Sequence, residues 1–169
     1  MKELLQQCAA YNTWADRLLT ERILQLPEEQ QVQVIPNSFP SLHLTLLHMW
    51  DAGSVWWQRI KLQETVTWPS GQFKGNTRDA AANLCQQDKL WEDWVNNASP
   101  ALIAHVFAYQ NSRKEHFKQP VYQVLQQVFN HNTYHRGQIV AMLRQLGADN
   151  IPGTDFIAWS RSNVKNVRM

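Results

Sequence analysis

The sequence predicts an all-α protein, a four-helix bundle with a short β-hairpin inserted between the third and fourth helices. Its 169 residues suffice for one domain with its own hydrophobic core, so we expect a single domain over residues 1–169. Only six glycines are present, and none precedes Gly53. The prolines cluster between long stretches in which apolar residues recur every three or four positions. This spacing is typical of amphipathic helices.

The first predicted helix spans residues 2–25, and the second begins at Ser41. Apolar residues recur at helical spacing through the first segment until Pro27 ends the pattern. The Ser41 side chain can accept a hydrogen bond from the first turn of the second helix, which we expect to reach about Glu64. A proline-containing connection joins the two helices.

The third predicted helix begins after Asn76, whose side chain can cap it, and continues to about Ala98. Between residues 100 and 120 the apolar period changes from helical to alternating, as in β-strands. Residues alternate on both sides of Asn111-Ser112, so we expect a hairpin with a two-residue turn at that point.

The fourth predicted helix has Pro120 in its first turn and Gly147 just past its end. Four helices of this length, about 33 to 40 Å each, suit a bundle. The connections after the first two helices are long, and the hairpin follows the third. A crossover between parallel neighbours therefore fits, and a simple up-down-up-down order is not required.

Composition restricts the classes of function. Sixteen Lys and Arg against fourteen Asp and Glu leave a formal charge of +2, so we expect no nucleic-acid partner. No segment has the roughly 18 consecutive apolar residues of a membrane span, and we expect no membrane partner. Cys8 and Cys85 stand far apart, which favours a reducing compartment and a soluble, cytoplasmic protein.

Six histidines against two cysteines allow an imidazole metal site and argue against a thiolate cluster. His131 and His135 are four residues apart on the apolar face of the fourth helix. Such a pair is either a metal site or a set of hydrogen-bonded core residues. If the second and fourth helices are antiparallel, His48 lies at nearly the same level. We therefore predict that His48, His131 and His135 bind one metal ion.

The other polar candidates have simpler interpretations. His43 lies about 140° around the helix from His48, so we expect a surface or cap residue. His105 and His116 would share one side of the hairpin and form a rival pair, or else lie on a solvated strand face. Asp51 is the acid nearest to a predicted ligand. It could accept a hydrogen bond from an imidazole, ligate, act as a catalytic acid or base, or be an exposed helix residue.

Three histidines with no evident fourth protein ligand describe an open site, whose remaining position takes water or substrate. Imidazole donors suit a divalent transition metal such as Zn, Ni or Fe, and the ligand set does not fix which one. Gln138, three residues after His135, is either a pocket donor or a plain polar residue. Trp50 and Trp57 are candidates for a subunit interface or for ordinary core packing.

Several short motifs extend over nearly the whole chain. They are Tyr11-Asn12-Thr13-Trp14-Ala15, His48 followed by Trp56 and Arg59, Phe129-Asn130-His131-Asn132-Thr133-Tyr134-His135-Arg136-Gly137-Gln138, Leu146-Gly147, and Thr154-Asp155-Phe156. Together they resemble the DinB-like family, the damage-inducible, YfiT-type group of metal-dependent proteins. The most specific part is the His-x-x-x-His-Arg-Gly-Gln run in register with an upstream histidine.

The resemblance implies a four-helix bundle in up-down-down-up order, a divalent metal held by His48, His131 and His135, and often a homodimer. Some relatives transfer low-molecular-weight thiols to electrophiles or use such a thiol in isomerisation, and others have no established activity. Relatives often carry an acid shortly after the first histidine. Here Gly53 and Ser54 stand in that place.

The leading functional hypothesis is a metal-dependent enzyme of the low-molecular-weight-thiol S-transferase type, acting on an electrophilic small molecule. Cys8 and Cys85 fall in helices and are expected to be packing residues, so the sulfur would come from a cosubstrate. The alternatives are a metal-dependent hydrolase, with Asp51 as acid or base, and a non-catalytic, stress-associated metal-binding dimer.

Overall fold

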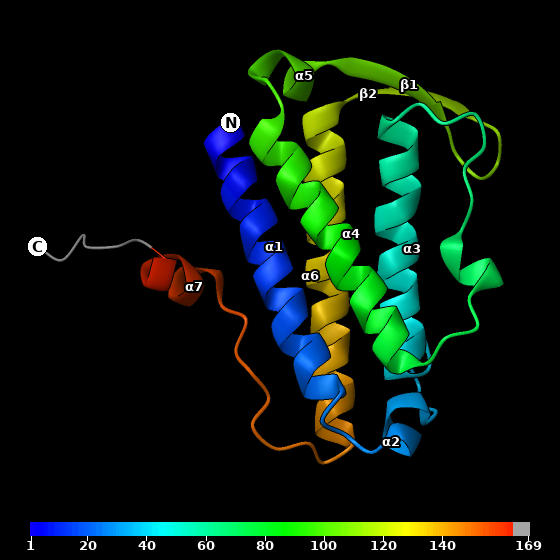
Figure 1. Cartoon of the computed structure of the whole chain (residues 1–169), viewed down its shortest axis with the longest axis vertical. Coiled ribbons are helices and arrows are strands. Elements are labelled where there is room, and N and C mark those ends of the chain that lie inside the picture. The colour runs from blue at the N-terminus through cyan, green and yellow to red at the C-terminus, as the bar shows by residue number, and fades with distance from the viewer. Residues whose placement is uncertain (164–169) are drawn as a thin grey trace, which may run out of the picture.

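Four long helices run side by side, which confirms the predicted bundle (Figure 1). The computed structural model describes residues 1–163. The long helices are α1 (Lys2–Ile23), α3 (Leu42–Ile60), α4 (Thr77–Asn97) and α6 (Val121–Gln145). Helices α1 and α6 run in one direction and α3 and α4 in the other, the up-down-down-up order (Figure 1). Helix α3 packs against α6, and the two run in opposite directions, so they are antiparallel neighbours.

Side-chain caps start two of these helices where the sequence predicts them. Ser41 Oγ accepts a hydrogen bond from the backbone N–H of Leu44, at 3.1 Å. Asn76 accepts from the backbone N–H of Asp79, whose carboxylate accepts in turn from the N–H of Asn76. This reciprocal pair is a capping box. Past the end of α6, Gly147 has φ +71°, a left-handed conformation that glycine adopts at little cost.

Helix α3 ends at Ile60, earlier than the predicted end near Glu64. Leu62 takes a left-handed backbone conformation with φ 52°, which turns the chain away from the helix axis. The Gln58 side chain then bonds both the N–H and the carbonyl of Thr67, each at 2.8 Å. The side-chain amide of Gln58 thus attaches the loop at Thr67 to α3. The apolar period of the sequence contains no signal for this turn.

A hairpin follows α4, as predicted, but a short helix precedes it. Helix α5 (Pro100–Ala104) takes the place of the first residues expected in the strand, and it is followed by β1 (Val106–Gln110) and β2 (His116–Pro120). The strands pair antiparallel, with Tyr109 opposite Phe117. The hairpin lies across one end of the bundle, over the ends of α3 and α6 (Figure 1). Pro120 ends β2 and precedes α6, so it lies just before the helix and not in its first turn.

The predicted two-residue turn at Asn111-Ser112 is wrong. The strands are joined by five residues, 111–115. Asn111 Oδ1 accepts from the backbone N–H groups of Arg113 and Glu115, at 2.8 and 3.0 Å, and Lys114 has φ 63°. The asparagine side chain therefore organises a longer loop than the strand period alone suggests.

Three short elements complete the described chain: α2 (Glu28–Val32), the 3-10 turn η1 (Pro69–Gln72) and α7 (Phe156–Asn163). Helix α7 packs on α1 through the ring of Tyr11, which lies edge-on to Phe156 and to Trp159 at centroid distances of 5.2 and 5.7 Å. Within residues 1–163, no helix combines the length and the apolarity needed to cross a bilayer.

The core is divided into two apolar clusters along the bundle axis. One cluster surrounds the first turns of α3 and α4. It includes Leu19, Ile23, Leu42, Leu46, Leu84, Ile139, Met142 and Leu143. The other surrounds Trp91 near the hairpin. It includes Leu5, Ala9, Val95, Ile103, Phe107, Val121, Leu125 and Val128. Burial of these side chains is the main favourable contribution to folding.

A buried polar network separates the two clusters. Arg136 Nη1 donates to Asp16 Oδ1 at 2.8 Å and to Asn12 Oδ1 at 2.9 Å. Asn132 Nδ2 donates to Asp16 Oδ2 at 2.7 Å, and Asn12 Nδ2 donates to Asp88 Oδ1 at 2.9 Å. All five residues are buried. The network therefore joins α1, α4 and α6 at mid-height by hydrogen bonds in place of apolar contacts.

Asp88 is the acid of this network whose pKa is raised. Burial first, and then the negative charge of Asp16, raise the pKa of Asp88 well above its ordinary value of 3.8. Asp16 forms the ion pair with Arg136, in which both side chains are almost completely excluded from solvent. A single cation thus lies among two acids, and the raised pKa favours the protonated form of Asp88.

Candidate metal centre

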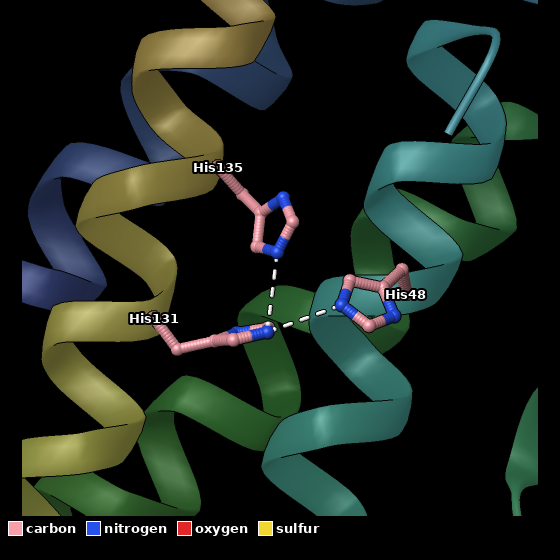
Figure 2. A group of neighbouring side chains, drawn as sticks. All are labelled: His48, His131 and His135. Atoms are coloured by element: carbon pink, nitrogen blue, oxygen red, sulfur yellow. Dashed lines mark hydrogen bonds between the residues drawn. The ribbon is translucent and has the colours of Figure 1, made fainter. Parts of the chain in front are cut away.

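The three predicted histidines meet between α3 and α6 (Figure 2). His48 lies in α3, and His131 and His135 lie on consecutive turns of α6, four residues apart. Because α3 and α6 are antiparallel neighbours, the beginning of one helix lies beside the end of the other. His48 therefore reaches the level of the pair from the opposite side, as the sequence reasoning predicts.

The ring nitrogens have the spacing of donors around one ion. His131 Nε2 lies 3.1 Å from His48 Nε2 and 3.1 Å from His135 Nε2. One ring nitrogen of each histidine lies within 4.8 Å of those of the other two. Tetrahedral Zn²⁺ has Zn–N bonds of about 2.0 to 2.1 Å, which separates neighbouring donors by about 3.3 Å. Two of the three donor separations therefore match those around one ion, and the third is no more than 4.8 Å.

All three imidazoles are neutral near pH 7. Burial first, and then the charges of the neighbouring histidines, lower the pKa of His48 to about 4. Burial and then His135 lower the pKa of His131 to about 4 as well. Burial also lowers the pKa of His135. A neutral imidazole presents one unprotonated nitrogen, which is the form that binds metals.

Gln138 determines which nitrogen of His135 is free. His135 Nδ1 lies 2.7 Å from the Gln138 amide oxygen, which only accepts, so Nδ1 carries the proton and Nε2 presents its lone pair. His131 Nε2 cannot both donate to His135 Nε2 and accept from His48 Nε2, so its two 3.1 Å contacts cannot both be hydrogen bonds. A cation bound by all three nitrogens would satisfy the nitrogen that is left without a partner, so the donor set fits a metal.

Two aromatic side chains border the triad. The ring of Phe39 stacks on His48, with centroids 3.8 Å apart and planes 17° apart, and it lies edge-on to His135 at 5.7 Å. Tyr134 lies edge-on to the other side of His135 at 5.0 Å. Sequence reasoning missed Phe39, because it lies in a proline-rich connection without any period. Its position two residues before the Ser41 cap was the only available hint.

Asp51 has a different role from those considered for it. It is buried, and its two carboxylate oxygens accept hydrogen bonds from the backbone N–H and the hydroxyl of Ser70. Its hydrogen bonds therefore attach the turn η1 to α3, and it does not accept a hydrogen bond from a triad imidazole. Within residues 1–163, no carboxylate belongs to the group of donors around His48.

The remaining histidines lie apart from the triad. His43 Nδ1 lies 3.2 Å from the hydroxyl of Thr77 at the start of α4. His105 is exposed and follows α5, so it lies outside the hairpin strands, while His116 Nε2 lies 3.0 Å from Gln110 Nε2. The rival pair of His105 and His116 is therefore not formed, because the strand register places His116 opposite Gln110 while His105 lies beside Val121 at the other end of the hairpin.

Comparisons with known proteins agree with the fold and the motifs. The chain matches the profile of the DinB family over residues 1–164. It is 31% identical over 164 residues to protein DinB of Bacillus subtilis strain 168, an alignment that covers 86% of this chain and 87% of that protein. A crystal structure of a DinB-like protein from Bacillus cereus superposes with a TM-score of 0.69 at 18% identity, covering 89% of this chain and 95% of that one.

Proposed function

Because the chain belongs to the DinB family and gathers three histidines around one point, we propose that it is a metal-dependent enzyme that transfers a low-molecular-weight thiol to an electrophilic small molecule. The observation that carries the proposal is the convergence of three neutral imidazoles with no carboxylate in the group. Such a set leaves one coordination position open for a substrate atom.

The residues around the triad have separate roles in this proposal. His48, His131 and His135 hold a divalent metal such as Zn, Ni or Fe, which would lower the pKa of a coordinated thiol. Gln138 fixes the orientation and the free nitrogen of His135. Phe39 covers one side of the His48 ring and restricts the access of water to the donors.

The chain's own cysteines are poor nucleophiles. Burial raises the pKa of Cys8, and it raises the pKa of Cys85 to about 11. Neither cysteine belongs to the group of donors at the triad. A thiol stays protonated and unreactive under these conditions. We therefore propose that the reacting sulfur comes from a cosubstrate, in the cytoplasm, where such thiols are kept reduced.

The two alternatives receive less support. A hydrolase would need an acid or base beside the metal, and the acid considered for that role, Asp51, is bonded to Ser70. A non-catalytic, stress-associated dimer was considered because of the tryptophans. Trp50 lies edge-on to Phe73 at 5.5 Å, and Trp57 lies edge-on to the buried Trp91 at 5.1 Å. These two rings pack within their own chain, which favours ordinary core packing over a subunit interface.

Metal content is the first test. Untagged protein is purified, loaded separately with Zn, Ni and Fe, and its metal measured by elemental analysis. We expect one ion per chain, lost in each of His48→Ala, His131→Ala and His135→Ala. His116→Ala is the matched control, because it removes an exposed imidazole outside the triad. Equal loss of metal in the control would contradict the assignment of the triad.

Thiol transfer is the second test. Metal-loaded protein is assayed with monochlorobimane and a panel of low-molecular-weight thiols, before and after chelation. We expect turnover that disappears with the chelator, returns when metal is added back, and is absent in His131→Ala. No turnover with any thiol would exclude the transferase. Hydrolysis of an activated ester would then favour the hydrolase, and light scattering would determine whether the protein is a homodimer.

A further inference from the structure

Arg59 is an unpaired cation at the far end of α3 from His48. Its side chain forms no ion pair within residues 1–163 and donates no hydrogen bond there, and its Nε is buried without a partner. Burial lowers the pKa of Arg59, as expected for a cation without a counter-ion. A half-buried guanidinium with unsatisfied donors is costly unless a ligand supplies the acceptor.

Two aromatic rings hold this guanidinium in place. Its central carbon lies 4.7 Å from the centroid of the Trp56 ring and 5.3 Å from that of Tyr109. The two rings lie edge to face at 5.1 Å. Stacking on aromatic faces leaves the edge of a guanidinium, with its N–H groups, free for a carboxylate. Arg59 lines a cavity of about 340 Å³ beneath the hairpin, together with Trp68, Tyr109 and Glu64. The Glu64 carboxylate forms no ion pair with Arg59 within residues 1–163.

A separate, amide-rich groove is bordered by the same two rings. Its volume is about 500 Å³, and Trp56, Tyr109, Gln119, Gln127 and Asn130 are among the residues that line it. None of its lining residues is charged. The side chains of Gln127 and Asn130 make no hydrogen bond within the described chain, and both residues lie in the turn of α6 just before His131. The groove is therefore bordered at one side by the two rings that stack on Arg59, and on α6 by the residue that precedes His131.

The spacing along α3 gives the length of a molecule that would reach both sites. Arg59 follows His48 by eleven residues, close to three turns, so both lie on the same side of the helix about 17 Å apart. Its guanidinium lies over Trp56, which is only about 12 Å from His48 along the axis. A chain of tripeptide size extends about 10 Å, and a metal–sulfur bond and a salt bridge add about 5 Å.

We propose that Arg59 binds a carboxylate of the thiol substrate, and that this substrate is an extended molecule of about tripeptide size whose amide or hydroxyl groups bind along the groove. The inference rests on the proposed thiol transfer for the identity of the reacting end. Arg59 is a binding residue in this scheme and takes no part in the bond-forming step. Cysteine and cysteamine would be too short to span both sites.

The test is a binding measurement with S-methylglutathione, whose blocked sulfur cannot act as a thiolate ligand. Calorimetry is run on metal-free and zinc-loaded protein. We expect binding in both forms, with Arg59→Gln weakening it by about tenfold or more and Arg59→Lys weakening it less. The control is Lys61→Gln on the same helix. It removes a cation stacked on Trp57 at 4.8 Å that does not line either cavity, and it should leave affinity within about twofold.

A second arm requires no variant. The dialkyl ester of S-methylglutathione has the same length without the carboxylates, so wild-type protein should bind it as weakly as Arg59→Gln binds the acid. Equal affinity for acid and ester, equal affinity of Arg59→Gln and wild type, or no measurable binding of the acid would each overturn the proposal. If Arg59-dependent binding is found without thiol transfer, the proposed function fails and the anion site stands. Thiol transfer that is unaffected by Arg59→Gln would support the proposed function and overturn the carboxylate site at Arg59.

Discussion

Replacement of Arg136 by methionine should destabilise the protein severely. Arg136→Met keeps the apolar stem but removes the only cation of the buried network, leaving the Asp16 carboxylate without its 2.8 Å partner. Both side chains are excluded from solvent. Removing one partner of such a pair costs about 3 to 5 kcal/mol. For a chain of 169 residues, at about 2.1 cal/mol/K per residue, this lowers the melting temperature by about 8 to 14 °C.

The assay is thermal unfolding followed by circular dichroism, with Arg17→Met as the control. Arg17 pairs with Glu21 at 3.6 Å on the exposed side of α1, and this pair should contribute less than about 1 kcal/mol. The double variant Arg136→Met, Asp16→Asn removes the unpaired charge and should recover part of the loss. A melting temperature for Arg136→Met within about 3 °C of wild type would refute the reasoning, as would an equal loss in Arg17→Met.

Three further predictions concern single side chains near the network and the triad. Asp88→Asn should stabilise the protein at pH 7. A carboxyl group whose pKa is raised in the folded protein contributes its full stability only below the ordinary pKa of 3.8, and this contribution is lost as the pH rises towards the pKa of the folded state. Urea unfolding from pH 4 to 8 should show the advantage of the variant growing with pH, and a constant difference would contradict the raised pKa of Asp88. Gln138→Leu should weaken zinc binding about 10- to 100-fold by chelator competition, because His135 loses its acceptor, and an unchanged affinity would exclude that role. Asp51→Ala should leave zinc affinity unchanged while proteolysis between residues 61 and 76 increases, and loss of zinc would contradict its assignment to η1.

The helices were predictable because their signals are local. Ser41 and Asn76 stand before apolar periods and cap them, and Gly147 follows the last one. The meeting of His48 with His135 was predictable for a related reason. Residue number fixes the height of a side chain along a helix, so the antiparallel order of two helices is enough to bring both histidines to one level.

The turns and the polar contacts were not predictable in the same way. The left-handed turn at Leu62 and the clamp of Gln58 on Thr67 involve residue types that occur equally in helices and loops. The bonds of Asp51 to Ser70 join residues nineteen positions apart, and no period relates them. Their pairing depends on how the loop folds back, which is a tertiary property.

The buried network left one signal that the sequence reasoning did not use. The buried stripe of α1 runs through Leu5, Ala9, Leu19 and Ile23 at helical spacing, and the positions between them on that stripe are Asn12 and Asp16. Polar residues inside an otherwise apolar stripe indicate a polar partner across the core. On α6 the partners Asn132 and Arg136 show the same four-residue spacing.

Helix α6 serves the metal centre and the network with adjacent residues. His131 and His135 face α3, while the next residue after each, Asn132 and Arg136, faces α1 and α4. Insertion or deletion of one residue in this turn would rotate everything beyond it by about 100° and misplace both sets together. Insertions and deletions among homologous sequences are therefore expected in the hairpin loop at 111–115 or before α4. Sequence alignments should show this segment of α6 without gaps.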